Sequence, residues 1–140
     1  MIMKLEIHLK KGIGELVFDS SIEDIIKIIG PPTEVEEMGE DIDYPTTVLH
    51  YEELGLSLFF DNNSATKLTC IDLDNPNATL FGETIIDLFP RKIEELMIKN
   101  NIFNETKEKE DWGEMRISFE DYSIDFYFID EKLVSITFGK

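Results

Sequence analysis

Two stretches of the chain share one alternation of apolar and polar positions. They are "YEELGLSLFFDNN" (residues 51–63) and "FEDYSIDFYFIDEK" (residues 119–132). A period of two is typical of a strand with one buried face. The alternation therefore predicts that Phe60 and Phe128 are equivalent core residues. The matched apolar positions are Leu56, Leu58 and Phe60 in the first stretch and Ile124, Phe126 and Phe128 in the second.

The segments on either side of these stretches also match. Upstream, "VLHY" (residues 48–51) corresponds to "RISF" (residues 116–119), and downstream "KLTCIDL" (residues 67–73) corresponds to "KLVSITF" (residues 132–138). The intervening residues are rich in Asn, Asp, Gly and Ser, which favour turns. The pattern predicts three antiparallel strands in each half of the chain.

A helix is predicted before each set of strands. In "SSIEDIIKIIG" (residues 20–30) four isoleucines fall on one helical face, a serine can cap the start, and Gly30 with two prolines ends it. In "KIEELMIKNN" (residues 92–101) the apolar face is Ile93, Leu96 and Met97, and Pro90 precedes it.

These elements predict an α+β fold. Two tandem repeats of helix, loop and three-strand antiparallel meander, at approximately residues 12–74 and 80–140, would form one sheet with the helices on one face. We expect residues 1–140 to be a single domain. "KLEIHL" (residues 4–9) is expected to add an edge strand, and "TIIDLF" (residues 84–89) a short extra helix.

A helix ending in "IIGPPTEVEE", followed by a meander that begins "YEELGLSLFF", resembles the repeat of the beta-lactamase inhibitor protein fold. The same unit occurs in small lipoproteins of the bacterial barrel-assembly machinery. The resemblance rests on "IGPP" (residues 29–32), and the second half has "KNNIFNE" (residues 99–105) instead. It implies a curved sheet built from two units. The cysteine that a lipoprotein needs near its start is absent.

The charge is unusually negative. Thirty acidic residues against thirteen basic ones give a formal net charge of −17, which would repel nucleic acid and anionic membranes and attract a basic partner. Solubility is the simpler explanation of this charge. The first residues do not resemble a signal peptide and Cys70 has no partner for a disulfide, so we expect a cytoplasmic protein.

No motif predicts a metal or cofactor. "DLDNPNATLFGE" (residues 72–83) spaces its acids like a calcium loop but has Pro76 and Asn77 where a ligand and a glycine belong. His8 and His50 with one cysteine are too few for zinc. Cys70 could pair with a histidine as a nucleophile, although a cysteine in a strand usually serves packing.

The residues that alternate with the core positions would lie on the open face of the sheet. Phe59 and Tyr127 are matched there, and aromatic anchors among charged residues are typical of protein-recognition surfaces. The alternative is that these aromatics only stabilise the sheet through cross-strand pairs. The predicted partner-binding residues are Phe59, Tyr127, His50, Asp61, Arg116 and Asp125.

The sequence therefore predicts a non-enzymatic, acidic protein-binding module, such as an inhibitor or a toxin-neutralising immunity protein of a bacterium. Its partner would be another, basic protein, with no cofactor, nucleic acid or membrane involved. The alternative is a small hydrolase or ligand-binding enzyme. Its site would lie in the acidic stretches at residues 36–43 and 108–114.

Overall fold

Eight strands form one antiparallel sheet in the computed structural model, which describes residues 4–39, 45–62 and 65–140. Their order across the sheet is β10-β11-β12-β13-β7-β6-β5-β4, so the two halves of the chain meet where β13 pairs with β7. The strands are β4 (Glu34–Met38), β5 (Thr46–Tyr51), β6 (Leu56–Asp61), β7 (Lys67–Leu73), β10 (Thr106–Lys109), β11 (Glu114–Phe119), β12 (Ile124–Ile129) and β13 (Lys132–Gly139).

Five short strands form a second sheet in the order β3-β2-β1-β8-β9. Its β1 pairs with β2 in an antiparallel and with β8 in a parallel arrangement, so it joins the start of the chain to the segment between the halves. The strands are β1 (Glu6–His8), β2 (Gly12–Ile13), β3 (Leu16–Val17), β8 (Thr79–Leu80) and β9 (Glu83–Thr84).

Both α-helices begin and end at residues suited to those positions. In α1 (Ile22–Ile29) the Ser21 hydroxyl accepts a hydrogen bond from the backbone N–H of Asp24, and Gly30 ends the helix at φ 83°. Pro90 begins α2 (Pro90–Lys99). Both lie at the segments where the sequence predicts helices.

A short 3₁₀ turn connects the second and third strands of each half. These turns are η1 (Glu52–Leu54) and η2 (Glu120–Tyr122), and each is followed by a left-handed residue, Gly55 at φ 60° and Ser123 at φ 52°. Both halves also have an irregular register at the same place, between Phe59 and Phe60 and between Tyr127 and Phe128. Such irregularities bend strands and increase their twist.

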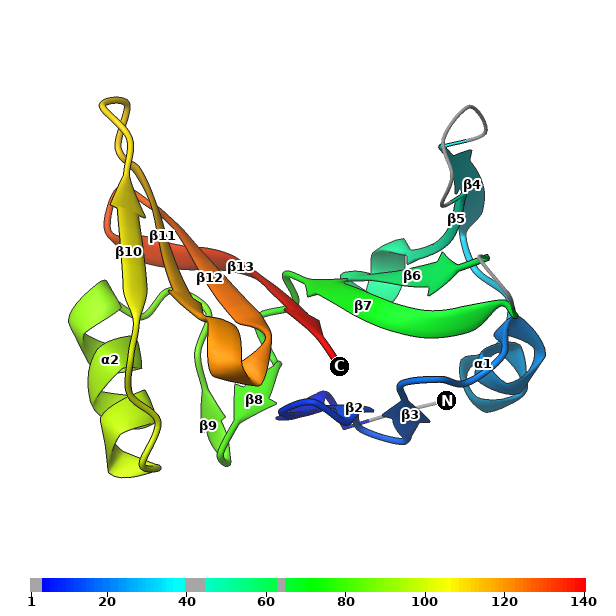
Figure 1. Ribbon diagram of the computed structural model, residues 1–140, viewed down its shortest axis with the longest axis horizontal. Helices are drawn as coiled ribbons and strands as arrows, with labels where there is room; N and C mark the ends of the chain where they lie inside the picture. Colours follow the sequence, from blue (N-terminus) through cyan, green and yellow to red (C-terminus); the bar gives the residue numbers. More distant parts are fainter. Residues whose placement is uncertain (1–3, 40–44, 63–64) are drawn as a thin grey trace.

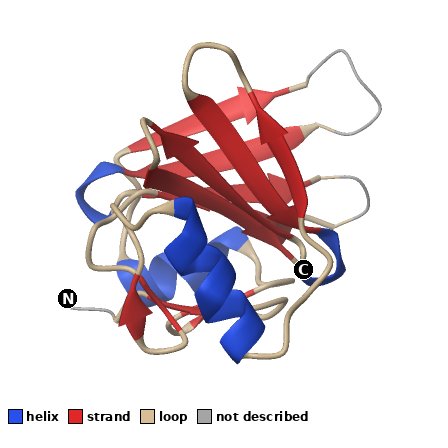
Figure 2. Ribbon diagram, turned by 90° about the vertical axis from the view of Figure 1, so that its left-hand side faces the viewer, coloured by secondary structure: helices blue, strands red, loops and turns tan. Residues whose placement is uncertain are grey.

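The core lies between the large sheet and a second layer. Figure 1 shows α2, the small sheet and α1 side by side along one face of the large sheet, and Figure 2 shows the same two layers from the side. Inward-facing side chains fill the space between them, and the largest fully buried ones are phenylalanines. These are Phe60, Phe126, Phe128 and Phe138. The predicted core positions Phe60 and Phe128 are therefore confirmed.

Among the described residues, neither a helix nor a strand of the small sheet covers the opposite face of the large sheet, and the sheet curves around this face (Figure 1). In Figure 1 the hairpin of β10 and β11 stands at one end and that of β4 and β5 at the other, while β13 and β7 lie between them. We call this the open face.

The predicted fold class is wrong. The protein is mostly β, with 45% of its described residues in strands and 18% in helices. It has two sheets in place of the predicted single sheet of three-strand meanders, and the small sheet shares the second layer with the helices (Figure 1). Each half contributes four strands to the large sheet, because the segments before β5 and β11 also pair, as β4 and β10. The limits of two internal repeats remain a prediction.

Two smaller predictions are also wrong. The first segment does not extend the large sheet, since β1 pairs with β2 and β8 in the small one. The "TIIDLF" segment (residues 84–89) is no helix: Thr84 pairs with Thr79, and Asp87 has a left-handed φ of 74°, which interrupts helical geometry.

Candidate functional site

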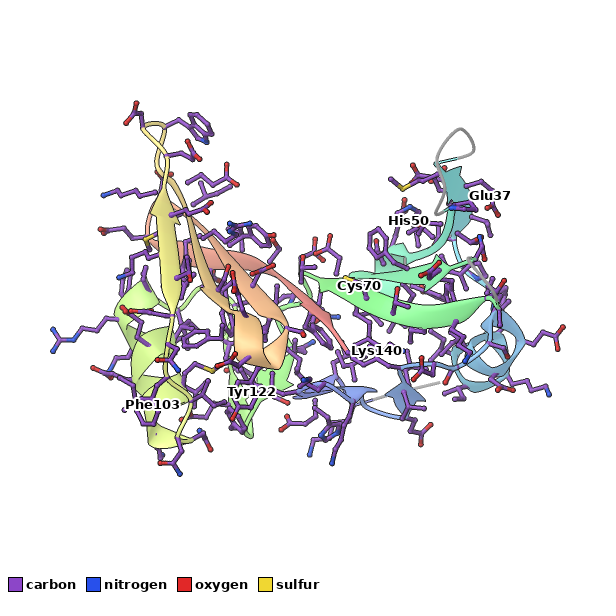
Figure 3. All side chains as sticks on the ribbon, in the orientation of Figure 1. Glu37, His50, Cys70, Phe103, Tyr122 and Lys140 are labelled. Carbon is purple, nitrogen blue, oxygen red and sulfur yellow. The ribbon has the colours of Figure 1, made fainter. Side chains whose placement is uncertain are left out.

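Strand alternation brings the predicted partner-binding residues to the open face. In β6 and β12 every second residue is buried in the core, and the residues between them, including Phe59 and Tyr127, are half-buried. The inward and outward assignment of these strands is confirmed. Figure 3 shows His50 and Cys70 on the open side of the sheet and Glu37 on the other side of β4.

His50, Phe59 and Asp61 form the first group on this face. Phe59 lies opposite Val48 and Cys70 in the neighbouring strands, and Asp61 lies opposite Thr46 and Lys67. Val48 is completely buried although its position faces outward. Phe59 is its direct cross-strand neighbour, so part of the Phe59 side chain covers Val48. This contact agrees with the alternative that the aromatics stabilise the sheet through cross-strand pairs.

His50 links three strands through its ring nitrogens. Its Nδ1 lies 2.8 Å from the Ser57 Oγ in β6, and its Nε2 lies 2.9 Å from the Glu36 Oε1 in β4. A serine, a histidine and a carboxylate in a row are also the parts of a nucleophilic triad. However, Asp72 and Asp74 line the pocket beside Ser57, and their charges would destabilise an oxyanion forming there. The contacts of His50 with Ser57 and Glu36 instead stabilise the position of β4 at the edge of the sheet.

Arg116, Asp125 and Tyr127 form the second group. Arg116 in β11 lies directly opposite Tyr127 in β12, and its Nη2 lies 2.8 Å from the Glu108 Oε2 in β10. The Glu108 charge, together with Tyr127 and Asp125, raises the pKa of the Arg116 guanidinium. The cation of this group is therefore already held by an acid of its own chain.

The central strands carry residues that the sequence analysis did not include in the site. At the middle of the open face the Thr137 hydroxyl donates a hydrogen bond of 3.0 Å to the Asp72 carboxylate. Nearby, burial and the charges of Asp72 and Asp125 raise the pKa of Cys70 to about 11. The same alternation in "KLTCIDL" and "KLVSITF" (residues 67–73 and 132–138) could have placed Cys70, Asp72 and Thr137 there.

The structure does not bring the two aromatic residues together. Phe59 lies opposite Cys70, which in turn lies opposite Gly139, whereas Tyr127 lies opposite Ser135. Two strands therefore separate Phe59 from Tyr127, which corresponds to about 14 Å across the sheet. The predicted site residues form two groups of three on either side of β7 and β13.

Two pockets lie on the open face, one at each 3₁₀ turn. Pocket A, of about 250 Å³, follows η1 and includes Glu52, Ser57, Asp72, Asp74 and Ser135 in its lining. Pocket B, of about 380 Å³, follows η2 and includes Cys70, Arg116, Glu120, Asp125 and Thr137. The open face is thus hollowed at two places, and carboxylates line both.

We expect the Cys70 thiol to react slowly. With a pKa of about 11 its thiolate fraction at pH 8 is about a hundredfold below that of a thiol at the ordinary value of 9.0, and the thiolate is the reactive form. Reaction with a disulfide reagent such as DTNB measures this. The Asp72→Asn variant should react faster, because one of the charges that raises the pKa is removed. Equal rates for folded and urea-unfolded protein would contradict the prediction.

A pair of carboxyl groups lies on the other side of the sheet. Burial and a hydrogen bond with Glu94 raise the pKa of Glu105 to about 7, and the same hydrogen bond lowers the pKa of Glu94. The Lys107 Nζ lies 3.3 Å from the Glu94 Oε2. An apolar pocket of about 160 Å³ beside the pair is lined by Ile98 and Phe103 among others. Sequence reasoning missed this pair, because it lies in neither predicted acidic stretch.

The acids considered for calcium do not converge. Asp72 lies in β7 of the large sheet and Glu83 in β9 of the small one. In the described part of the chain no three His, Cys, Asp or Glu side chains are grouped so that they could hold a metal ion. Residues 40–43 of the first acidic stretch lie outside the described residues. No helix among residues 4–39, 45–62 and 65–140 is long and apolar enough to cross a membrane.

Neither a protein-family model nor a curated protein matches the sequence. A solved structure matches the fold: that of an extracellular protein containing an SCP domain from Bacillus anthracis str. Ames, with a TM-score of 0.52 and 15% identity. The match covers 96% of this chain and 50% of the other, so the chain spans about half the length of that protein. Since this chain resembles an extracellular protein, the cytoplasmic location expected from the sequence is withdrawn.

Proposed function

We propose that this protein is a non-enzymatic binding module that holds a basic protein on its open face. One observation carries the proposal: a curved sheet face, covered by no helix or second sheet of the described chain, presents two half-buried aromatics and two carboxylate-lined pockets. Surfaces that bind proteins typically combine aromatic anchors with charges that select the partner. The resemblance of "IGPP" and the following strands to the beta-lactamase inhibitor repeat suggests an inhibitor or an immunity protein.

The charge of the whole chain supports a basic partner. At −17, the protein attracts positive proteins over distances of about a Debye length, which speeds their association at low salt. Arg116, the arginine of the predicted site, is already counted in this charge and is bound to Glu108.

The Phe59→Ala and Tyr127→Ala variants test the proposal. A partner captured from the host at low salt and identified by mass spectrometry should bind each variant at least about thirtyfold more weakly, since truncating an aromatic hot spot costs about 2 kcal/mol or more. Titration calorimetry measures the loss, and thermal unfolding checks that each variant is folded. Asp125→Asn should mainly slow association and reduce its salt dependence.

Phe103→Ala is the matched control, because Phe103 is 53% exposed and lines the pocket on the far side of the sheet. Its affinity for the same partner should be that of the unmodified protein. If both open-face variants bind as tightly as the control, the aromatics only stabilise the sheet and the proposed site is wrong.

The carboxyl pair of Glu94 and Glu105 favours a second candidate, an enzyme that transfers protons. A carboxyl group with a pKa of about 7 suits general acid–base catalysis at neutral pH. The adjoining pocket of about 160 Å³ is below the size of about 300 Å³ at which small-molecule sites begin. The binding module is therefore the better supported function.

A further inference from the structure

The two central strands pair at matching positions of "KLTCIDL" (residues 67–73) and "KLVSITF" (residues 132–138). Asp72 in β7 lies opposite Thr137 in β13, and the neighbouring pairs on either side are mates under exchange of the two strands. Exchange of the strands turns the pair of Leu73 and Ile136 into the pair of Phe138 and Ile71. A local two-fold axis therefore passes through the middle of the open face, perpendicular to the sheet, at the hydrogen bond between Thr137 and Asp72.

The same two-fold axis, which exchanges β7 and β13, also relates pocket A to pocket B. Each begins at the left-handed residue after a 3₁₀ turn, Gly55 in pocket A and Ser123 in pocket B. Each is also lined by one residue from the other half of the chain, Ser135 in pocket A and Cys70 in pocket B. The open face thus offers two related cavities, and the central hydrogen bond lies between them.

Both pockets favour a cation, and pocket A does so more strongly. Glu52, Asp72 and Asp74 line pocket A without a basic residue. No described basic side chain forms an ion pair with any of these three acids. In pocket B two acids accompany Arg116, whose guanidinium is bound to Glu108. Burial raises the pKa of Cys70 and the charges of Asp72 and Asp125 add to this, in agreement with a negative field between the pockets.

The distance between the pockets restricts what can occupy both. Asp74 lines pocket A just after β7, and Asp125 of pocket B lies opposite Thr137, which in turn lies opposite Asp72. Two strand spacings and two residues of strand therefore separate Asp74 from Asp125, about 12 Å, and four residues of an extended ligand span about 13 Å. Because side chains of an extended chain alternate, positions four apart point to the same side, whereas positions three apart do not.

We propose that the open face binds one extended polypeptide segment with two basic side chains four positions apart, one in each pocket. This inference rests on the proposed function and specifies its partner. Pocket A holds its cation between carboxylates near η1, and pocket B holds the second near Asp125. The half-buried aromatics, on the strands outside the central pair, contact the segment's remaining side chains.

Two synthetic peptides test the spacing. Both are glycine–serine peptides of nine residues with blocked ends and two arginines, which are four positions apart in one peptide and three apart in the other. Net charge and composition are therefore equal. Titrations followed by ¹H–¹⁵N NMR at low salt should show about fivefold tighter binding of the four-apart peptide, since one partly exposed ion pair contributes up to about that factor. The shifted signals should include residues of both pockets.

Asp74→Asn should remove the preference between the peptides, because it weakens pocket A. Glu15→Gln is the matched control: it removes the same charge from an exposed residue in the turn between β2 and β3, and the preference should persist. Equal affinities of the two peptides, or no binding of either, would overturn the two-pocket inference. The proposed function would still stand if a captured partner bound the Phe59→Ala and Tyr127→Ala variants more weakly.

Discussion

The Phe60→Ala variant should lose about 3–5 kcal/mol of folding free energy, the usual cost of removing a buried phenylalanine side chain. Phe60 is 0% exposed, lies between Thr47 and Leu68 in the large sheet and belongs to the main hydrophobic cluster. Because domains are typically stable by only 5–15 kcal/mol, the loss would be a large part of the total. Phe128→Ala, in the matching position of β12, should behave alike.

Urea unfolding followed by circular dichroism measures this effect. Tryptophan fluorescence is less suitable, because Trp112 is 71% exposed and changes its surroundings little on unfolding. Phe59→Ala is the matched control, since the same side chain is removed one position earlier in β6 from the open face. Its midpoint should fall clearly less. An unchanged midpoint for Phe60→Ala would mean that the buried face of β6 is the one that carries Phe59.

The sequence was sufficient to predict the strands with a strong pattern. In β6 and β12 one face packs against the second layer and the other does not, so the apolar residues alternate and each side chain is assigned correctly. The edge strands β4 and β10 were missed, because all their side chains are exposed and "EVEEM" and "TKEK" show no buried face. Charged, short edge strands protect a sheet from association but resemble loops in sequence.

The small sheet could not be predicted from its own residues. Its strands have two or three residues each, too few to show a period, and β1 pairs with β8 more than 70 residues later. Similarly, Ile85, Ile86 and Leu88 suggested a helix in the connecting segment. The left-handed backbone at Asp87 and the strand pairing at Thr84 are incompatible with a helix there.

For the candidate site, the sequence predicted the face and not the arrangement on it. Alternation alone placed Phe59 and Tyr127 outward. Their separation depends on how β7 pairs with β13, which joins residues from different halves of the chain. No local pattern determines that register, so the two pockets and the central contact between Thr137 and Asp72 became visible only in the structure.

The Gly12→Ala variant should be about 3 kcal/mol less stable, at the upper end of the usual cost of overpacking. Gly12 is buried in β2 at φ 149°, and a Cβ there would lie 1.9 Å from the backbone oxygen of Leu16 and 3.0 Å from the Cα of Val17. Neither atom can rotate away as a side chain would. The hairpin is also fixed by a hydrogen bond of 2.8 Å from the Phe18 N–H to the Lys11 carbonyl.

Gly82→Ala measures the cost of a positive φ without a clash. Gly82 also has a positive φ, 79°, but a Cβ there meets no described atom within 4 Å, so only conformational strain of about 1–2 kcal/mol is expected. Both variants change the unfolded chain alike, so the difference in urea midpoint reports the contact with Leu16 together with the extra strain of φ 149° over φ 79°. Equal losses would show that β2 and β3 can move apart. Leu80 lies in β8 and pairs with Ile7 of β1. Hydrogen exchange at its backbone N–H would then show whether the small sheet opens independently of the large one.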